Sequence, residues 1–229
     1  MERTPTLERL AIALLGVGLM SAAPRAQAHP HMWIDARAAF VFDDASRLSA
    51  VTQRWLFDEM FSPFSMQGVK KNKNGTYPAA TLTSMANDWM GALAEPVSHF
   101  FTRVTVDGKV LSFGKPRDAA LAWDDKLKRL ALTFTLPLAN PVSLAATPAR
   151  IDIYDPTYFV AYAFDEKNAV SLTHAPAGCQ SDYHRPRELD FATMQQLAAI
   201  PADADPDALP EELFAITRGL THRIDIKCE

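Results

Sequence analysis

The sequence has 229 residues, of which 48% are hydrophobic and 22% are charged. This is the composition of an ordinary globular protein, and it excludes a disordered, collagen-like or low-complexity chain. Lysine and arginine together number 23 against 27 aspartate and glutamate residues, which gives a formal net charge of -4. The chain therefore has no surplus of positive charge for binding the phosphates of nucleic acids.

The first 28 residues have the features of a secretory signal peptide. Residues 10–23 are apolar and uncharged, but this stretch is shorter than the ~20 residues that a membrane-spanning helix needs. It is followed by Ala26-Gln27-Ala28, a small-x-small sequence of the kind that signal peptidase cleaves. We predict cleavage after Ala28, export to a bacterial periplasm, and a single domain over residues 29–229 with no stable membrane anchor. The alternative is a buried N-terminal helix.

Alternating apolar residues after the predicted cleavage site indicate β-strands. In residues 31–43 the apolar side chains share one face of the chain: Ile34, Ala36, Ala38, Phe40 and Phe42. Residues 43–46 form a turn, and residues 48–57 return as an antiparallel partner. Met, Leu, Phe and Ala then recur at helical spacing in residues 58–69 and 79–94. This predicts a helical insertion at about residues 59–95.

Strand patterns resume after the insertion. We predict strands at residues 99–106, 109–113, 127–136, 151–154, 158–164 and 169–173 and at the C-terminus, with Asp107-Gly108 as a hairpin turn. The acidic segment 201–210, rich in Pro and Ala, is typical of a surface linker, and a short helix follows from Pro210 to Gly219. The predicted fold is mainly β: an antiparallel β-sandwich-like domain with a helical insertion and a short C-terminal helix plus strand.

The chain has two cysteines, Cys179 and Cys228. In an exported protein both would meet an oxidising compartment, which favours a disulfide over two unpaired thiols. Cys228 has the same phase as Ile224 and Ile226, so its thiol is directed toward the core side. In the chain-entropy model, closing this loop of 50 residues contributes roughly 4 kcal/mol to stability.

Cleavage after Ala28 would place His29-Pro30-His31 at the new N-terminus. In an extended chain the side chains of His29 and His31 project to the same side, as do those of Trp33 and Asp35. The α-amine, with a pKa of about 7.7–8.0, loses its proton readily to a competing metal ion and adds a third nitrogen donor. Nitrogen donors favour Zn, Ni, Co or Cu over Mg or Ca. We predict a transition-metal site here; the alternative is that both histidines are solvated and bind nothing.

Carboxylates from other segments are candidates to complete this site as ligands or supporting partners. Asp58 and Glu59 follow the second predicted strand, and Asp155 precedes a proline at a strand end. The alternative for Asp58 and Glu59 is an acidic pair at a helix N-terminus. A square-planar chelate through backbone amides is excluded, because Pro30 has no N–H to lose.

No catalytic signature accompanies these residues. The sequence contains no Gly-x-Ser-x-Gly, His-Glu-x-x-His, phosphate-loop or Cys-x-x-Cys motif. The other histidines are scattered, which is typical of surface or structural residues: His99, His174, His184 and His222. We therefore do not expect an enzyme. A copper enzyme with a histidine brace at His29 is the weaker alternative, since no distant histidine partner and no substrate-binding signature accompany it.

Several motifs resemble the exported bacterial family called domain of unknown function 1007. They span nearly the whole mature chain: His29-Pro30-His31, Phe57-Asp58-Glu59, Val106 to Lys109, Thr133 to Leu138, Tyr154 to Val160, Ala175 to Cys179, and Ile226 to Cys228. Members are described as periplasmic components of an uncharacterised ABC-type transport system. The resemblance implies an association with nickel/cobalt-type permeases and transition-metal homeostasis.

Together these observations predict a periplasmic protein that binds a transition metal for, or otherwise serves, a nickel, cobalt or zinc transport system. Its expected partner is an inner-membrane metal permease. The alternative is an interaction module that binds no ligand and docks on a membrane complex through the sandwich and its helical insertion.

Overall fold

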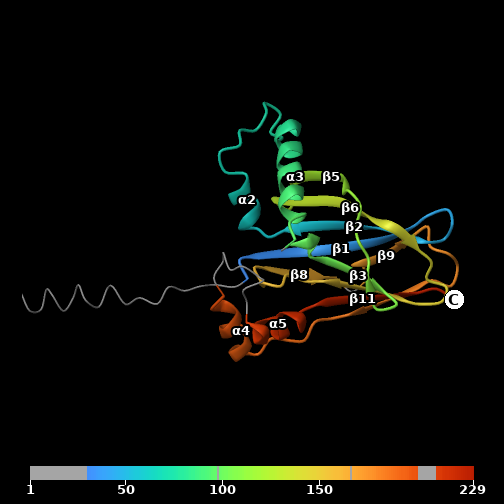
Figure 1. Cartoon of the computed structure of the whole chain (residues 1–229). Helices are drawn as coiled ribbons and strands as arrows, with labels where there is room; N and C mark the ends of the chain where they lie inside the picture. The colour runs from blue at the N-terminus through green and yellow to red at the C-terminus, as the bar shows by residue number, and fades with distance from the viewer. Residues whose placement is uncertain (1–29, 97, 166, 201–209) are drawn as a thin grey trace, which may run out of the picture.

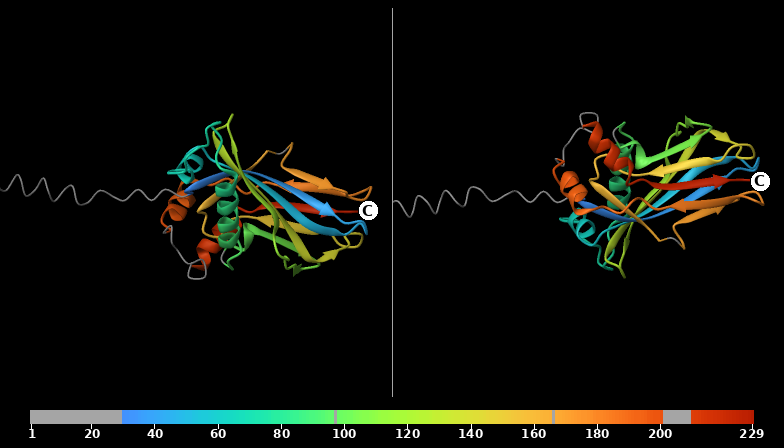
Figure 2. Two further views of the ribbon diagram at one scale, coloured as in Figure 1. Left: turned by 90° about the horizontal axis from the view of Figure 1, so that it is seen from above. Right: turned by 90° about the horizontal axis from the view of Figure 1, so that it is seen from below.

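The computed structural model describes residues 30–96, 98–165, 167–200 and 210–229. The predicted signal peptide, His29 and nearly all of the predicted linker lie outside these ranges. Two β-sheets pack face to face, and the helices gather toward one end of the sandwich (Figures 1 and 2). The fold is mainly β, with a helical insertion and a C-terminal helix and strand, as the sequence predicts.

Sheet A contains six strands in the order β5-β6-β2-β1-β8, with β9 also paired to β1. Its strands are β1 (Met32–Phe42), β2 (Leu48–Phe57), β5 (Arg117–Asp124), β6 (Arg129–Val142), β8 (Val160–Phe164) and β9 (Val170–Thr173). Sheet B has five strands in the order β10-β11-β7-β3-β4. Its strands are β3 (Thr102–Val106), β4 (Lys109–Val110), β7 (Ala149–Ile153), β10 (Gln180–His184) and β11 (His222–Lys227).

Most strand pairs are antiparallel, but β1 also has two parallel neighbours. Met32 lies opposite Val160 of β8, and Ala38 lies opposite Val170 of β9, both in parallel register. On its other edge β1 pairs with β2 in the predicted antiparallel hairpin. Strand β1 is therefore an interior strand of a mixed sheet, rather than a strand of a purely antiparallel one.

The helical insertion consists of α2 (Phe61–Ser65) and α3 (Ala79–Leu93). Helix α2 is shorter than the predicted helix at residues 58–69, and the chain turns at Gly68, which has a φ of +81°. A 3-10 turn at His99–Phe101 precedes β3. Helix α4 (Phe191–Ala198) is not among the predicted elements, whereas α5 (Glu211–Arg218) lies between Pro210 and Gly219 as predicted.

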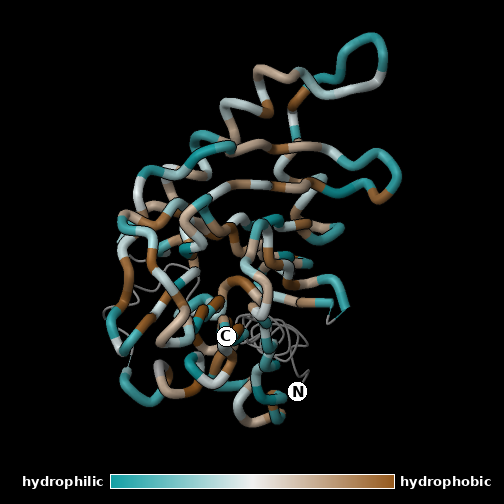
Figure 3. Tube along the Cα trace, turned by 90° about the vertical axis from the view of Figure 1, so that its right-hand side faces the viewer, coloured by the Kyte–Doolittle hydropathy of each residue, from teal (hydrophilic) through white to brown (hydrophobic). Residues whose placement is uncertain are grey.

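The inner face of β1 is covered by two different layers. Its alternate residues from Ile34 to Phe42 are all buried, as the pattern predicts. Ile34 belongs to a core cluster with Met90 of α3, whereas Phe40 belongs to a cluster with Ile151 and Ile224 of sheet B. The helical insertion thus covers the part of sheet A that sheet B leaves open, while hydrophilic residues gather on the projecting loops (Figure 3).

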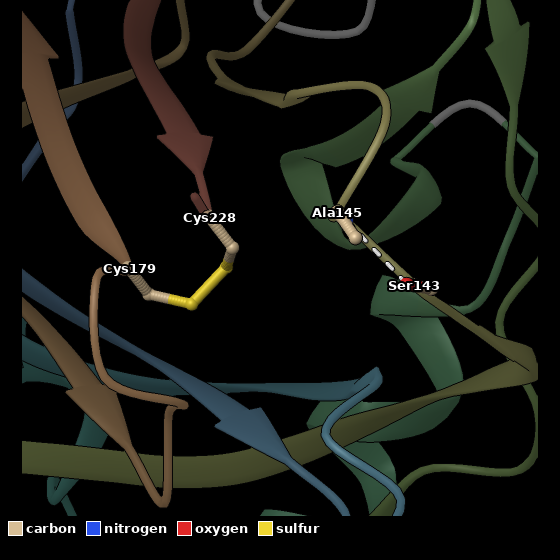
Figure 4. The surroundings of a disulfide bond; sticks show 4 residues. All are labelled: Ser143, Ala145, Cys179 and Cys228. Carbon is tan, nitrogen blue, oxygen red and sulfur yellow. Dashed lines mark hydrogen bonds between the residues drawn. A yellow bond between two sulfur atoms is a disulfide. The ribbon is translucent and has the colours of Figure 1, made fainter.

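Cys179 and Cys228 form the predicted disulfide. Figure 4 shows that it joins the residue before β10 to the residue after β11, and Gln180 lies opposite Lys227 in the ladder between these strands. The bond lies at the end of the sandwich where the C-terminus is found, opposite the end where β1 begins (Figure 1). The bond thus links the edge strand β10 covalently to its neighbour β11 at this end of sheet B.

Candidate functional site

The candidate residues lie at one end of sheet A. Strand β1 begins where β2 ends, because Ile34 lies opposite Phe57, and where β8 begins, because Met32 lies opposite Val160. This register brings together the segments that carry His31, Asp58, Glu59 and Asp155. We call this region the β1 end of the sandwich; His29, the other predicted ligand, lies outside the described residues.

His31 is exposed and held in place at the start of β1. Its backbone N–H donates to the carbonyl of Phe159 at 2.9 Å, and its ring stacks on the Phe159 ring with centroids 4.9 Å apart. Trp33 and Asp35 are also exposed, so the three side chains share the outer face of β1, as predicted. The Asp35 carboxylate forms an ion pair with Arg129 at 2.7 Å.

Asp58 acts as a backbone clamp at the end of β2. One carboxylate oxygen accepts the N–H of Trp33 at 2.9 Å, and the other accepts the N–H groups of Met60 and Phe61 at 2.8 Å each. Partial burial favours the protonated form, but these backbone donors outweigh it and hold the pKa of Asp58 below its ordinary value. The geometry matches the alternative role of an acid at a helix N-terminus.

Glu59 is exposed, and it makes no hydrogen bond or ion pair within the part of the chain that the structure describes. Of the three predicted carboxylates, it is the one whose oxygen atoms are not engaged by backbone donors. Coordination of a metal ion by Glu59 would therefore break no bond seen in the structure.

Asp155 is 5% exposed and closes the turn that leads into β8. One of its oxygens accepts both the N–H and the hydroxyl of Thr157 at 2.8 Å, and the other accepts the N–H of Val160 at 2.8 Å. Burial raises the pKa of Asp155 despite these donors. The turn places Phe159 against His31, so Asp155 supports the histidine indirectly. To bind a metal ion directly, it would have to give up backbone hydrogen bonds.

A cavity of about 200 Å³ lies beside Asp155, between β8 and the start of β11. Among its lining residues are Tyr158, Tyr162 and His222. The buried hydroxyl of Tyr162 has no hydrogen-bond partner among the described residues. Burial, and after it the charge of Asp155, raises the pKa of Tyr162 well above its ordinary value, so this group is a neutral phenol.

His222, on the same cavity wall, links the two sheets. The Tyr183 hydroxyl is 2.7 Å from Nδ1 of His222, and the ring also forms a hydrogen bond with the backbone of Tyr162 in β8. Burial lowers the pKa of His222 to about 4, although the hydrogen bond to Tyr162 opposes this. A neutral ring that donates to Tyr162 and accepts from Tyr183 satisfies both contacts. The geometry thus gives His222 a structural role.

The metal prediction depends on His29. Within the ranges that the structure describes, no three His, Cys, Asp or Glu side chains come close enough to hold one metal ion. A site built on His31 therefore needs donors from His29 and the processed N-terminus. None of the helices in the same ranges is long and apolar enough to cross a membrane.

Three large apolar side chains are exposed at the β1 end, and they were not predicted as a functional feature. Trp33 is 51% exposed, Met60 83% and Phe64 71%. The carboxylate of Asp58 joins the first two through their backbone N–H groups, and Phe64 follows Met60 by one helical turn. We call these three residues the α2 apolar patch. The four-residue spacing of Met60 and Phe64 is visible in the sequence, but it does not indicate that these side chains are exposed in the folded protein.

Comparison with known proteins agrees with the resemblance noted in the sequence. An uncharacterized protein of Haemophilus influenzae (strain ATCC 51907 / DSM 11121 / KW20 / Rd) is 25% identical over 161 residues, which cover 69% of this chain and 74% of that protein. A family model described as "Protein of unknown function (DUF1007)" matches residues 14–228, which is nearly the whole chain. The chain therefore belongs to the DUF1007 family.

Proposed function

We propose that this protein is an exported transition-metal-binding or accessory protein of a nickel, cobalt or zinc transport system. The proposal places the metal at the processed N-terminus, with the His29 and His31 imidazoles and the α-amine as donors. Its partner would be an inner-membrane metal permease, and its compartment the periplasm.

The observation that carries the proposal is the setting of His31. Its backbone is fixed by Phe159 and its ring rests on the Phe159 ring, yet the side chain is exposed. A donor that is already oriented loses little conformational freedom on binding. The preceding Pro30 is buried, so the chain is anchored beside the predicted new terminus. Of the three predicted carboxylates, Glu59 could add an oxygen donor without the loss of a structural hydrogen bond.

The test begins with protein recovered after export. N-terminal sequencing and metal analysis of this material should give a chain that starts at His29 and carries a transition metal. Titration of the metal-stripped protein with Zn, Ni, Co and Cu, followed by calorimetry, should then show one site that a His29→Ala, His31→Ala variant lacks. Equal affinity in the double variant, or a chain that starts at another residue, would overturn the proposal.

The matched control is His174→Asn. His174 is exposed and follows β9, far along the sandwich from His31. Its φ of +55° is one that asparagine tolerates better than most residues. The control removes one imidazole without a change at the β1 end, so its metal affinity should equal that of the parent.

The α2 apolar patch favours a second function, an interaction module that needs no ligand. Exposed Trp, Met and Phe side chains grouped in one region are typical of protein-contact surfaces. In this case the protein lacking both histidines would still co-purify with the permease, whereas Met60→Ser, Phe64→Ser would not. The reverse pattern would leave metal binding as the function.

A further inference from the structure

The outer face of sheet B carries a hollow of about 430 Å³ that is rich in arginine. Five arginines line it: Arg103, Arg150, Arg185, Arg218 and Arg223. They come from β3, β7, the segment after β10, α5 and β11. The whole chain has a net charge of -4, so this concentration of positive charge runs against its overall composition.

The strand register explains why these residues meet. Arg103 lies opposite Asp152, Asp152 lies opposite Arg223, and Arg223 lies opposite His184, which forms one row across four strands. Arg103, Asp152 and Arg223 each stand between buried neighbours on their strands, so these three residues lie on the face directed away from the core. At one end of the sheet, α5 adds Arg218 beside this row.

Among the described residues, fewer carboxylates than arginines lie at the hollow. Asp152 is the acidic residue in its lining. Asp225 lies 3.7 Å from Arg150 and 3.3 Å from Arg223, and Glu211 lies 2.7 Å from Arg218. Within the described ranges, three carboxylates thus accompany the guanidinium groups of Arg103, Arg150, Arg218 and Arg223. The more exposed Asp182 contacts His184 at 3.6 Å.

Arg103 is the clearest unused donor. It is exposed and attracts the Asp152 carboxylate on the neighbouring strand, but it forms no hydrogen bond or close ion pair within the described part of the chain. Guanidinium groups present planar pairs of N–H donors that match the oxygens of phosphate. Several of them around one concave site favour a ligand that bears more than one negative charge.

We propose that this hollow binds a compact, multiply charged phosphate group, either of a soluble phosphate compound or of an anionic lipid headgroup. This site is separate from the N-terminal metal site and does not depend on it. The alternative is a purely structural role, in which the arginines form only cross-strand ion pairs and bind no external anion.

The test has two arms, both with the metal-stripped mature protein. The first is a calorimetric titration with inorganic pyrophosphate. The second is sedimentation with phosphatidylcholine vesicles that contain or lack phosphatidylglycerol. Arg103→Gln should weaken binding about tenfold, the effect of losing one charge-assisted hydrogen bond. Arg103→Gln, Arg218→Gln should weaken it further, and salt should weaken binding to the parent protein.

The matched control is Arg117→Gln on β5 of sheet A, where the arginine side chain is 59% exposed. It removes the same charge without a change at the hollow. Pyrophosphate binding that depends on Arg103 supports a soluble ligand, and binding confined to phosphatidylglycerol vesicles with the same dependence supports a lipid headgroup. Absence of binding in both arms, or equal weakening by Arg117→Gln, overturns the proposal.

Discussion

His222 gives the protein a stability that depends on pH in a defined window. The residue is 6% exposed, and its ring lies between Tyr183 of sheet B and the backbone of Tyr162 in sheet A. The perturbation we suggest is His222→Gln. Glutamine retains an N–H donor at the end of its side chain and does not titrate, so the link to Tyr162 is preserved while the proton-binding site is removed.

The magnitude follows from the two pKa values. Histidine in an unfolded chain has a pKa of about 6.5, and burial lowers that of His222 to about 4 in the folded protein. Between these values the unfolded chain binds a proton that the folded protein does not, so stability rises with pH. The contribution is complete above pH 6.5 and is lost as the pH falls toward 4. It amounts to about 3 kcal/mol.

The assay is urea unfolding of parent and variant, followed by tryptophan fluorescence at a series of pH values from 4 to 7.5. The parent should lose about 3 kcal/mol of unfolding free energy more than the variant over this range. Other groups titrate there too, and the difference between the two proteins removes their contribution. His174→Asn, which removes an exposed imidazole, should retain the pH dependence of the parent.

The reasoning would be refuted if parent and His222→Gln lost stability in parallel as the pH fell. A parallel loss would mean that His222 can take up its proton in the folded state at little cost. A general drop in the stability of the variant at every pH would not affect the argument, because the prediction concerns the slope.

Two further predictions concern stability. Cys179→Ser, Cys228→Ser should lower the unfolding free energy by about 4 kcal/mol, since the disulfide closes a loop between residues that are 49 positions apart; a reducing agent should have the same effect on the parent and none on the variant. Asp155→Ala leaves the N–H groups of Thr157 and Val160 unpaired, so it should cost about 2–3 kcal/mol in urea unfolding of metal-stripped protein. Unchanged stability of Asp155→Ala without metal would instead favour a role in coordination.

Elements with a strong local pattern were predictable from the sequence. Strand β1 alternates along its length, and the Asp107-Gly108 turn has positive φ at both residues, as a two-residue hairpin requires. Strand β10 was missed because its sequence, QSDYH, is polar throughout. The strand is held by its ladder with β11 and by the disulfide, and neither leaves an alternating apolar pattern in the chain.

Helix α4, which was not predicted, did have a capping signal in the sequence. Asp190 stands before Phe191, and its carboxylate caps the helix by accepting the N–H of Thr193 at 2.7 Å. The parallel pairing of β1 with β8 and β9 had no signal in the sequence. Local periodicity indicates which residues share a face of a strand, but it does not indicate which strands are neighbours in space.

The candidate site was predictable as a set of residue types and not as a geometry. The sequence places His31, Asp58 and Asp155 near strand ends, and the register brings these ends together. It does not reveal that backbone N–H groups already occupy both oxygens of Asp58 and Asp155. The arginine-lined hollow was likewise hidden, because Arg103, Arg150 and Arg223 are far apart in the chain and meet only through the ladders of sheet B.

The parallel ladder between β1 and β8 also sets an order of folding. Met32 and Val160 face each other across 128 positions of the chain, so sheet A cannot be completed until the segment that contains β8 is available to pair with β1. Contacts between such distant segments form slowly, because a large loop must be ordered before they stabilise the chain. A nascent chain that ends before β8 would leave one edge of β1 unpaired. We expect such truncated chains to remain loosely structured and to be degraded by proteases that spare the complete domain.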